Sequence, residues 1–88
     1  DWADLVVLDP PRKGAGAAVV RAIAERRPRA VAYVACDPAA LARDLATFAE
    51  AGYAATSIRA FDLFPMTHHV ECVAILHPHP DTGVHPLD

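Results

Sequence analysis

Two apolar runs in the first part of the chain are separated by an amphipathic segment. Residues 5–8 (LVVL) and 30–35 (AVAYVA) are apolar at consecutive positions, a pattern typical of short strands that are buried on both faces of a sheet. Over residues 15–27 the apolar side chains instead recur at helical spacing, which predicts a helix that Pro28 ends. This part of the chain is therefore predicted to run strand, helix, strand.

A second helix is predicted over residues 38–51. Its apolar face is formed by three residues at helical spacing: Leu41, Leu45 and Phe48. Asp37 and Pro38 suit the N-cap and the first helical position, because an aspartate can accept a backbone N–H bond and proline has no N–H to leave unpaired. Gly52 lies where a glycine commonly ends a helix.

Two further strands are predicted over residues 53–60 and 70–76, followed by the proline-containing sequence HPHPDTGVHPLD, which has no periodicity and is expected to be a tail. The order strand, helix, strand, helix, strand, strand predicts half of a doubly wound α/β sheet. In such sheets, loops at the carboxyl ends of strands bind ligands. The sequence contains no glycine-rich turn of the dinucleotide-binding or P-loop kind.

Composition narrows the class of protein. Apolar residues make up 53% and charged residues 22% of the 88 residues, as in packed globular proteins. No apolar run approaches the ~20 residues that a membrane span needs, and no signal peptide is recognised, so we expect a cytoplasmic protein without a membrane partner. The net charge of −3 provides no basic surface for nucleic acid. Cys36 and Cys72 are expected to be free thiols in a reducing compartment.

Asp9 and Cys36 each follow a predicted strand at its carboxyl end. Asp9, in the sequence DPPRKG, is either a turn residue or a carboxylate that the prolines direct into the ligand crevice. Cys36 precedes a helix N-terminus, where the helix dipole and free N–H groups favour a nucleophilic thiolate. The charge of Asp37 opposes this unless Asp37 caps the helix, and a lone cysteine is commonly no more than a small buried side chain.

Glu71 lies in the apolar stretch HHVECVAIL. A carboxylate is rarely placed in such a strand without a partner, so this position favours a functional role, with a partly exposed strand-end glutamate as the alternative. His68 and His69, together with Cys72, indicate a metal site only weakly, because no second pair of ligands has a zinc-site spacing. We therefore expect no metal, and we expect Cys72 to lie in the core.

Three segments span most of the chain in a characteristic order: DPPRKG at 9–14, YVACDPAALARDL at 33–45 and FDLFPMTHHVE at 61–71. Together they resemble the RNA 5-methyluridine methyltransferases, cysteine-dependent enzymes that methylate uridine in transfer and ribosomal RNA. The resemblance implies an α/β fold, namely the carboxyl-terminal half of a Rossmann-like methyltransferase sheet with an antiparallel last strand. It further implies that residues 1–77 are the carboxyl-terminal portion of the catalytic domain and that residues 78–88 are a flexible tail.

The resemblance also implies roles for single residues. Cys36 is the implied nucleophile and Glu71 the implied general base. Asp9 is implied to contact both the cofactor S-adenosylmethionine and the uracil, while Pro10 and His69 contact the uracil of a transfer or ribosomal RNA. Thiolate addition at carbon 6 of uracil activates carbon 5, and a base must then remove the carbon-5 proton so that the thiol can leave. Cysteine suits both steps because it attacks and departs well.

Members of this family carry their glycine-rich cofactor motif upstream. We therefore expect this chain to be a catalytic-domain fragment that is inactive alone and that self-associates through an unprotected strand edge at residues 5–8. Two other functions remain open. One is amino-methylation of DNA or protein, although such enzymes generally have an aromatic residue where Arg12 stands. The other is a non-catalytic α/β fragment that functions by association.

Overall fold

The computed structural model describes residues 5–64 and 69–79 of the chain. Its elements are β1 (Leu5–Leu8), α1 (Ala17–Glu25), β2 (Ala30–Ala35), α2 (Pro38–Glu50), β3 (Tyr53–Phe64) and β4 (His69–Pro78). Every predicted helix and strand is present and in the predicted order. None of the helices in the described ranges has the length and apolar character needed to cross a membrane.

The strands form one sheet in the order β1, β2, β4, β3. β1 and β2 are parallel and are joined through α1, and Leu8 pairs with Tyr33. β4 runs antiparallel to both of its neighbours, with Ala35 of β2 paired to Cys72. The predicted α/β fold with an antiparallel last strand is confirmed. Within the described residues β1 pairs with β2 only, so it forms one edge of the sheet.

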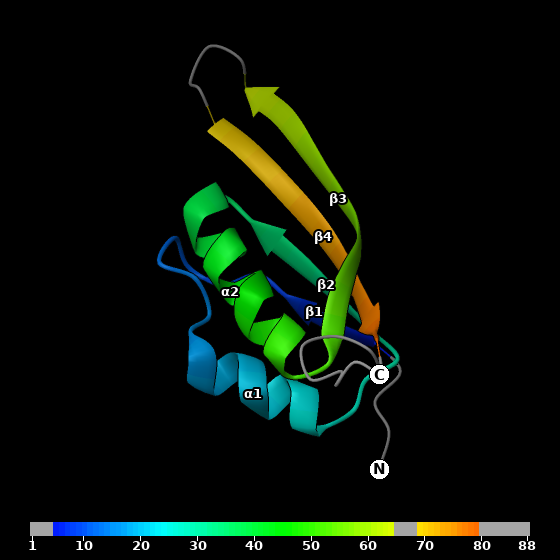
Figure 1. Cartoon of the computed structure of the whole chain (residues 1–88). Coiled ribbons are helices and arrows are strands. Elements are labelled where there is room, and N and C mark those ends of the chain that lie inside the picture. Colours follow the sequence, from blue (N-terminus) through cyan, green and yellow to red (C-terminus); the bar gives the residue numbers. More distant parts are fainter. Residues whose placement is uncertain (1–4, 65–68, 80–88) are drawn as a thin grey trace.

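Both helices pack against one face of the sheet (Figure 1). The core between helices and sheet is built from all elements except β1: Val20, Val31, Tyr33, Ala35, Leu41, Phe48, Tyr53, Cys72, Ala74 and Leu76. Side chains alternate across a strand, so the residues between these core positions lie on the opposite face, here called the open face. In β1, Leu5 and Val7 lie on the open face and are 58% and 65% exposed.

α2 begins at the predicted residue and ends next to the predicted glycine. The Oδ1 atom of Asp37 accepts the N–H of Ala39 at 3.0 Å, and Pro38 occupies the first helical position. At the other end Gly52 has a φ of 94°, a left-handed conformation that glycine adopts at little cost. The turn at Gly52 leads into Tyr53, which is buried in the core.

α1 is two residues shorter at each end than predicted. At its start the N–H groups of Ala15 and Gly16 donate to Asp44 of α2, and Gly16 has a φ of 88°, so both residues belong to the preceding loop. At its end Arg27 has a φ of 53° and turns the chain out of the helix before Pro28. Local periodicity could not locate these ends, because bonds to a distant residue and a backbone turn determine them.

β3 and β4 extend beyond their predicted ranges of 53–60 and 70–76 and form a long hairpin that projects past the other strands (Figure 1). Their pairing reaches Phe64 and His69 and is interrupted by two irregularities in register. The extra length arises because each strand satisfies the backbone groups of the other, whatever the apolar pattern of their side chains.

The start of the predicted tail is part of the fold. His77 belongs to β4 instead of the tail, and its Nδ1 lies 2.8 Å from Oγ1 of Thr56. The N–H of His79 donates to the carbonyl oxygen of Gly52 at 2.7 Å. Residues 80–88, which make up most of the expected tail, lie outside the described residues.

Candidate functional site

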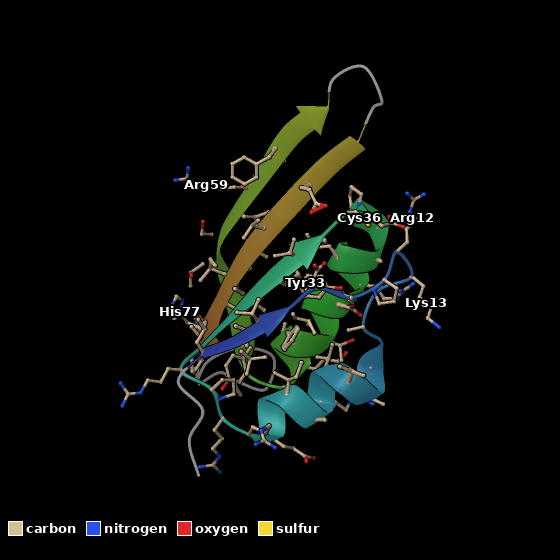
Figure 2. All side chains as sticks on the ribbon, turned by 180° about the vertical axis from the view of Figure 1, so that it is seen from behind. Arg12, Lys13, Tyr33, Cys36, Arg59 and His77 are labelled. Atoms are coloured by element: carbon tan, nitrogen blue, oxygen red, sulfur yellow. The ribbon has the colours of Figure 1, made fainter. Side chains whose placement is uncertain are left out.

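Asp9, Cys36 and Glu71 lie at one end of the sheet. Asp9 follows β1 and Cys36 follows β2, at the carboxyl ends of two parallel neighbours. Glu71 lies near the amino end of β4, which is the same end of the sheet because β4 runs antiparallel to β2. Figure 2 shows Cys36 at this end, together with Arg12 of the loop after β1, while His77 lies at the opposite end.

The register between β2 and β4 places Cys36 and Glu71 one residue beyond the last pair of the ladder, at neighbouring strand ends. Ala35, the last residue of β2, pairs with Cys72, and the next positions along this antiparallel pair are Cys36 and Glu71. Cys36 is exposed and Glu71 is half-buried. A thiol and a carboxylate therefore lie at adjoining strand ends, and the thiol is accessible to a ligand.

The carboxylate of Asp37 caps α2 through its bond to the Ala39 N–H. Asp37 is therefore used as a helix cap, which is the arrangement in which its charge does not oppose a thiolate at Cys36. Cys36 lies two residues before the first turn of α2, where the helix dipole provides a partial positive charge.

The other residues assigned to the site by resemblance lie at the same end of the sheet. Asp9 is exposed, and Pro10 beside it is half-buried. His69 is the first residue of β4, where its backbone pairs with Phe64. His68 lies outside the described residues.

Cys72 is part of the core, as predicted. Its side chain is 7% exposed and packs in the main cluster of buried residues, and both cysteines are free. Among the residues that the structure describes, no group of three or more His, Cys, Asp or Glu side chains is arranged to hold a metal ion.

Asp44 of α2, a carboxylate outside the group of predicted site residues, is buried close to this end of the sheet. It is 1% exposed. It accepts three hydrogen bonds: from the Ala15 N–H at 2.7 Å, the Gly16 N–H at 3.3 Å and the Tyr33 hydroxyl at 2.5 Å. These four residues are called the Asp44 cluster. Burial of a carboxylate is very unfavourable without such donors, so the cluster ties the loop over residues 9–16 to α2 and β2.

The same loop contacts α2 directly at Gly14, which is buried and has a φ of 93°. A Cβ at this position would lie 2.9 Å from Oδ2 of Asp44 and 3.1 Å from Cβ of Ala40. One residue earlier, the carbonyl oxygen of Lys13 accepts a hydrogen bond from the Arg43 guanidinium. The glycine of DPPRKG is thus required by the close approach of the loop backbone to α2.

Tyr33 is held as a neutral donor within the Asp44 cluster. Burial raises the pKa of Tyr33 well above its ordinary value of 10.0, and the hydrogen bond to Asp44 raises it further. The hydroxyl therefore keeps its proton and continues to donate to the carboxylate throughout the physiological pH range.

The sequence did contain a signal for Asp44. The residue lies three positions after Leu41 and four before Phe48, which places it on the buried face of the predicted helix. An acidic residue on that face needs donors from elsewhere in the fold. Which donors these are could not be predicted, because two of them are backbone N–H groups of a distant loop.

The described residues fit one edge of a site for S-adenosylmethionine. Asp9 and Pro10 lie at the carboxyl end of β1, where sheets of this kind bind ligands, and the Asp9 carboxylate is exposed there. In the loop that follows, the backbone at Gly14 packs directly against α2, so no ligand can lie between the loop and the helix at that point. No described loop has the glycine-rich form that would hold most of such a cofactor.

The family follows from a comparison of the sequence with known proteins. The sequence model of the tRNA (uracil-5-)-methyltransferase family matches residues 2–79, which include every segment described above. The chain belongs to this family.

The curated relatives that the chain matches are much longer than the chain itself. A protein named as an uncharacterized RNA methyltransferase from Streptomyces avermitilis is 65% identical over 75 residues, which cover 85% of this chain and 17% of that protein. Another from Thermotoga maritima is 47% identical over 74 residues, with 84% and 17% covered. The chain thus spans about one sixth of the length of these curated relatives.

A solved structure has the same fold over the shared part. The tRNA (uracil-54, C5)-methyltransferase of Pyrococcus abyssi, crystallised in complex with S-adenosyl-L-homocysteine, superposes with a TM-score of 0.73 at 40% identity. The match covers 83% of this chain and 18% of the Pyrococcus chain.

We predict that the two thiols differ in reactivity in the folded chain. Iodoacetamide should alkylate exposed Cys36 at least about tenfold faster than buried Cys72, which becomes accessible only on opening of the core. Tryptic peptides separate the two sites, since residues 30–43 contain Cys36 and the peptide that begins at residue 60 contains Cys72. Equal rates without denaturant, with equal rates in urea as the control, would contradict the described burial.

Proposed function

We propose that this chain is the carboxyl-terminal portion of the catalytic domain of an enzyme that methylates carbon 5 of uridine in transfer or ribosomal RNA, with S-adenosylmethionine as cofactor and Cys36 as nucleophile. The observation that supports this most strongly is the placement of exposed Cys36 at the strand end next to Glu71. A uracil bound at this end of the sheet would lie close to both a nucleophile, Cys36, and a base, Glu71. Membership of the uracil-5-methyltransferase family and the RNA methyltransferase relatives favour the same substrate class.

The first step that we propose is addition of the Cys36 thiolate to the target base. Its sulfur forms a bond to carbon 6 of uracil, and the electrons of the carbon 5–carbon 6 double bond move toward the carbonyl at carbon 4. Carbon 5 then becomes nucleophilic. S-adenosylmethionine, when bound, would supply the methyl group to carbon 5 and be left as S-adenosylhomocysteine. The target base must leave its stack to reach the thiol.

The second step is release of the product, in which Glu71 acts as the general base. Its carboxylate accepts the proton from carbon 5, and the electrons of that C–H bond restore the carbon 5–carbon 6 double bond. The bond between sulfur and carbon 6 breaks, and the thiolate leaves. Half-burial of Glu71, next to the strand end that carries Cys36, supports this assignment.

Asp9, Pro10 and His69 complete the proposed site as binding residues. We assign Asp9 to contacts with both cofactor and uracil, because it is exposed at the carboxyl end of β1, beside the strand that leads to Cys36. Pro10 restricts the backbone next to Asp9 and so helps to direct its carboxylate. His69 is assigned to the uracil from its place at the amino end of β4.

An amino-methyltransferase of DNA or protein fits these observations less well. Such an enzyme needs no thiol, whereas Cys36 is exposed at the end of the sheet where the acidic candidates also lie. A purely associative α/β fragment would leave this convergence of side chains unexplained. Cytoplasmic location stays a prediction, which the two free thiols favour.

We predict that Cys36→Ala, made in the complete enzyme that contains this chain, abolishes both methyl transfer and the covalent adduct with 5-fluorouridine RNA. The reason is that no addition to carbon 6 can occur without the thiolate. Cys72→Ala is the matched control, since it removes the same group from the core and should leave the rate of adduct formation nearly unchanged. Methylation retained by the Cys36 variant would contradict the mechanism.

We predict that Glu71→Gln in the complete enzyme separates the two steps. The adduct with uridine RNA should still form, but elimination should slow by about 10²-fold or more, because only the second step needs the base. Methylated RNA should therefore remain attached to the protein on a denaturing gel. If the folded variant forms no adduct at all, Glu71 binds substrate or activates the thiol instead.

We propose further that the isolated 88-residue chain is inactive and self-associates through β1. β1 pairs on one side only within the described residues, and its Leu5 and Val7 are exposed on the open face. An edge strand with unpaired backbone groups and apolar side chains, and without protecting charges, is prone to pair with another copy.

We predict that the purified chain forms dimers or larger species in light scattering and binds S-adenosylmethionine weakly or not at all in calorimetric titration. Val7→Lys, on the exposed side of the edge strand, should shift the chain toward monomer because like charges would face each other across a paired edge. Ala18→Lys, at an exposed position of α1, is the matched control and should leave association unchanged. A monomeric wild-type chain that binds the cofactor tightly would contradict both parts.

A further inference from the structure

The Asp44 cluster connects the two segments that carry the proposed reacting and binding groups. The 9–16 loop begins at Asp9, and α2 begins at Pro38, two residues after Cys36. Asp44 lies in the second turn of α2 and accepts hydrogen bonds from the far end of the loop. A single buried carboxylate therefore links the loop that starts at Asp9 to the helix that starts next to Cys36.

We propose that Asp44 is a positioning residue for uridine methylation, which holds the 9–16 loop on α2 and so fixes the place of Asp9 relative to Cys36. The inference rests on the proposed function and adds to it a residue from outside the group of side chains assigned to substrate or cofactor. Asp44 is 1% exposed, so it acts through the loop and not by touching a ligand.

The loop depends on α2 for its position. Residues 11–13 are exposed. The loop is attached to α2 at the Lys13 carbonyl oxygen, at Gly14 and at the N–H groups of the Asp44 cluster. Between Asp9 and these attachments lie Pro10 and Pro11, whose rings fix φ and make the segment stiff. A shift of the attached end is therefore passed on to Asp9 instead of being absorbed by the loop.

Both carboxylate oxygens of Asp44 are needed. Oδ2 accepts the Ala15 N–H and the Tyr33 hydroxyl, and Oδ1 accepts the Gly16 N–H. An asparagine has the same shape but one acceptor oxygen, and its NH₂ group would face a donor. Asp44→Asn therefore removes at least one bond of the cluster and introduces a repulsion, with no change in side-chain volume.

The test compares Asp44→Asn with Tyr53→Phe in the complete enzyme. Tyr53 donates its buried hydroxyl to the carbonyl oxygen of Pro28 at 2.6 Å, away from the 9–16 loop. Each substitution removes a buried hydrogen bond, so both variants lose stability. Rates of methyl transfer and of adduct formation with 5-fluorouridine RNA are measured at a temperature where unfolding curves show every variant fully folded.

Asp44→Asn should slow adduct formation and methyl transfer by about 10²-fold, the loss expected when reacting groups are displaced by ~1 Å. Tyr53→Phe should remain within about twofold of wild type, since a stability loss alone does not change the rate of a folded enzyme. Arg43→Met provides a second variant at an exposed position, which loses the bond to Lys13 and should slow both rates about tenfold with little change in melting temperature.

Equal rates for folded Asp44→Asn and Tyr53→Phe, or unchanged rates for Arg43→Met where Asp44→Asn fails to fold, would overturn the positioning role and leave the proposed function intact. A wild-type enzyme that neither methylates uridine nor forms the adduct would overturn the proposed function, and the positioning role with it. The wild-type reaction is therefore measured first.

Discussion

The hydrogen bonds of the buried Asp44 carboxylate hold together the parts of the structure on which the site depends. A carboxylate removed from water is strongly destabilising unless donors replace the lost hydration, and here two loop N–H groups and the Tyr33 hydroxyl do so. Each donor comes from outside α2. The carboxylate can therefore be satisfied only when the loop after β1, the strand β2 and the helix α2 are all in place, which makes the arrangement of these elements cooperative.

The direction of β4 is the second constraint. In an all-parallel sheet, the amino end of every strand lies opposite the ligand-binding end, and Glu71 would be remote from Cys36. Because β4 runs antiparallel to β2, its amino end lies at the same end of the sheet as the carboxyl ends of β1 and β2. The antiparallel direction of β4 thus places Glu71 at the same end of the sheet as the thiol of Cys36. The same pairing buries Cys72 one position further along.

Most of the fold was predictable from local features of the sequence. Apolar runs gave β1 and β2, and Asp37 and Gly52 located α2 within a residue, because caps depend on side chains next to the helix itself. The ends of α1 and the length of the β3–β4 hairpin were not predictable, since they depend on hydrogen bonds between residues far apart in the chain.

The site divides in the same way. Placement of Asp9 and Cys36 at the ends of adjacent strands follows from the order of elements, and the structure confirms that placement. The apolar periodicity of α2 does not predict the Asp44 cluster, because that pattern carries no information on the donors that a buried carboxylate needs. A carboxylate on the buried face of α2, together with a glycine in the preceding loop, indicates a contact that neither position predicts alone.

The central claim is that Cys36 forms the bond to uracil, and the most direct measurement is to map that bond. The complete enzyme is trapped with 5-fluorouridine RNA and digested with trypsin and ribonuclease, and the modified peptide is identified by mass spectrometry. The nucleotide is expected on Cys36, in the peptide of residues 30–43. Attachment to the peptide that begins at residue 60, which contains Cys72, or to no cysteine of this chain would contradict it.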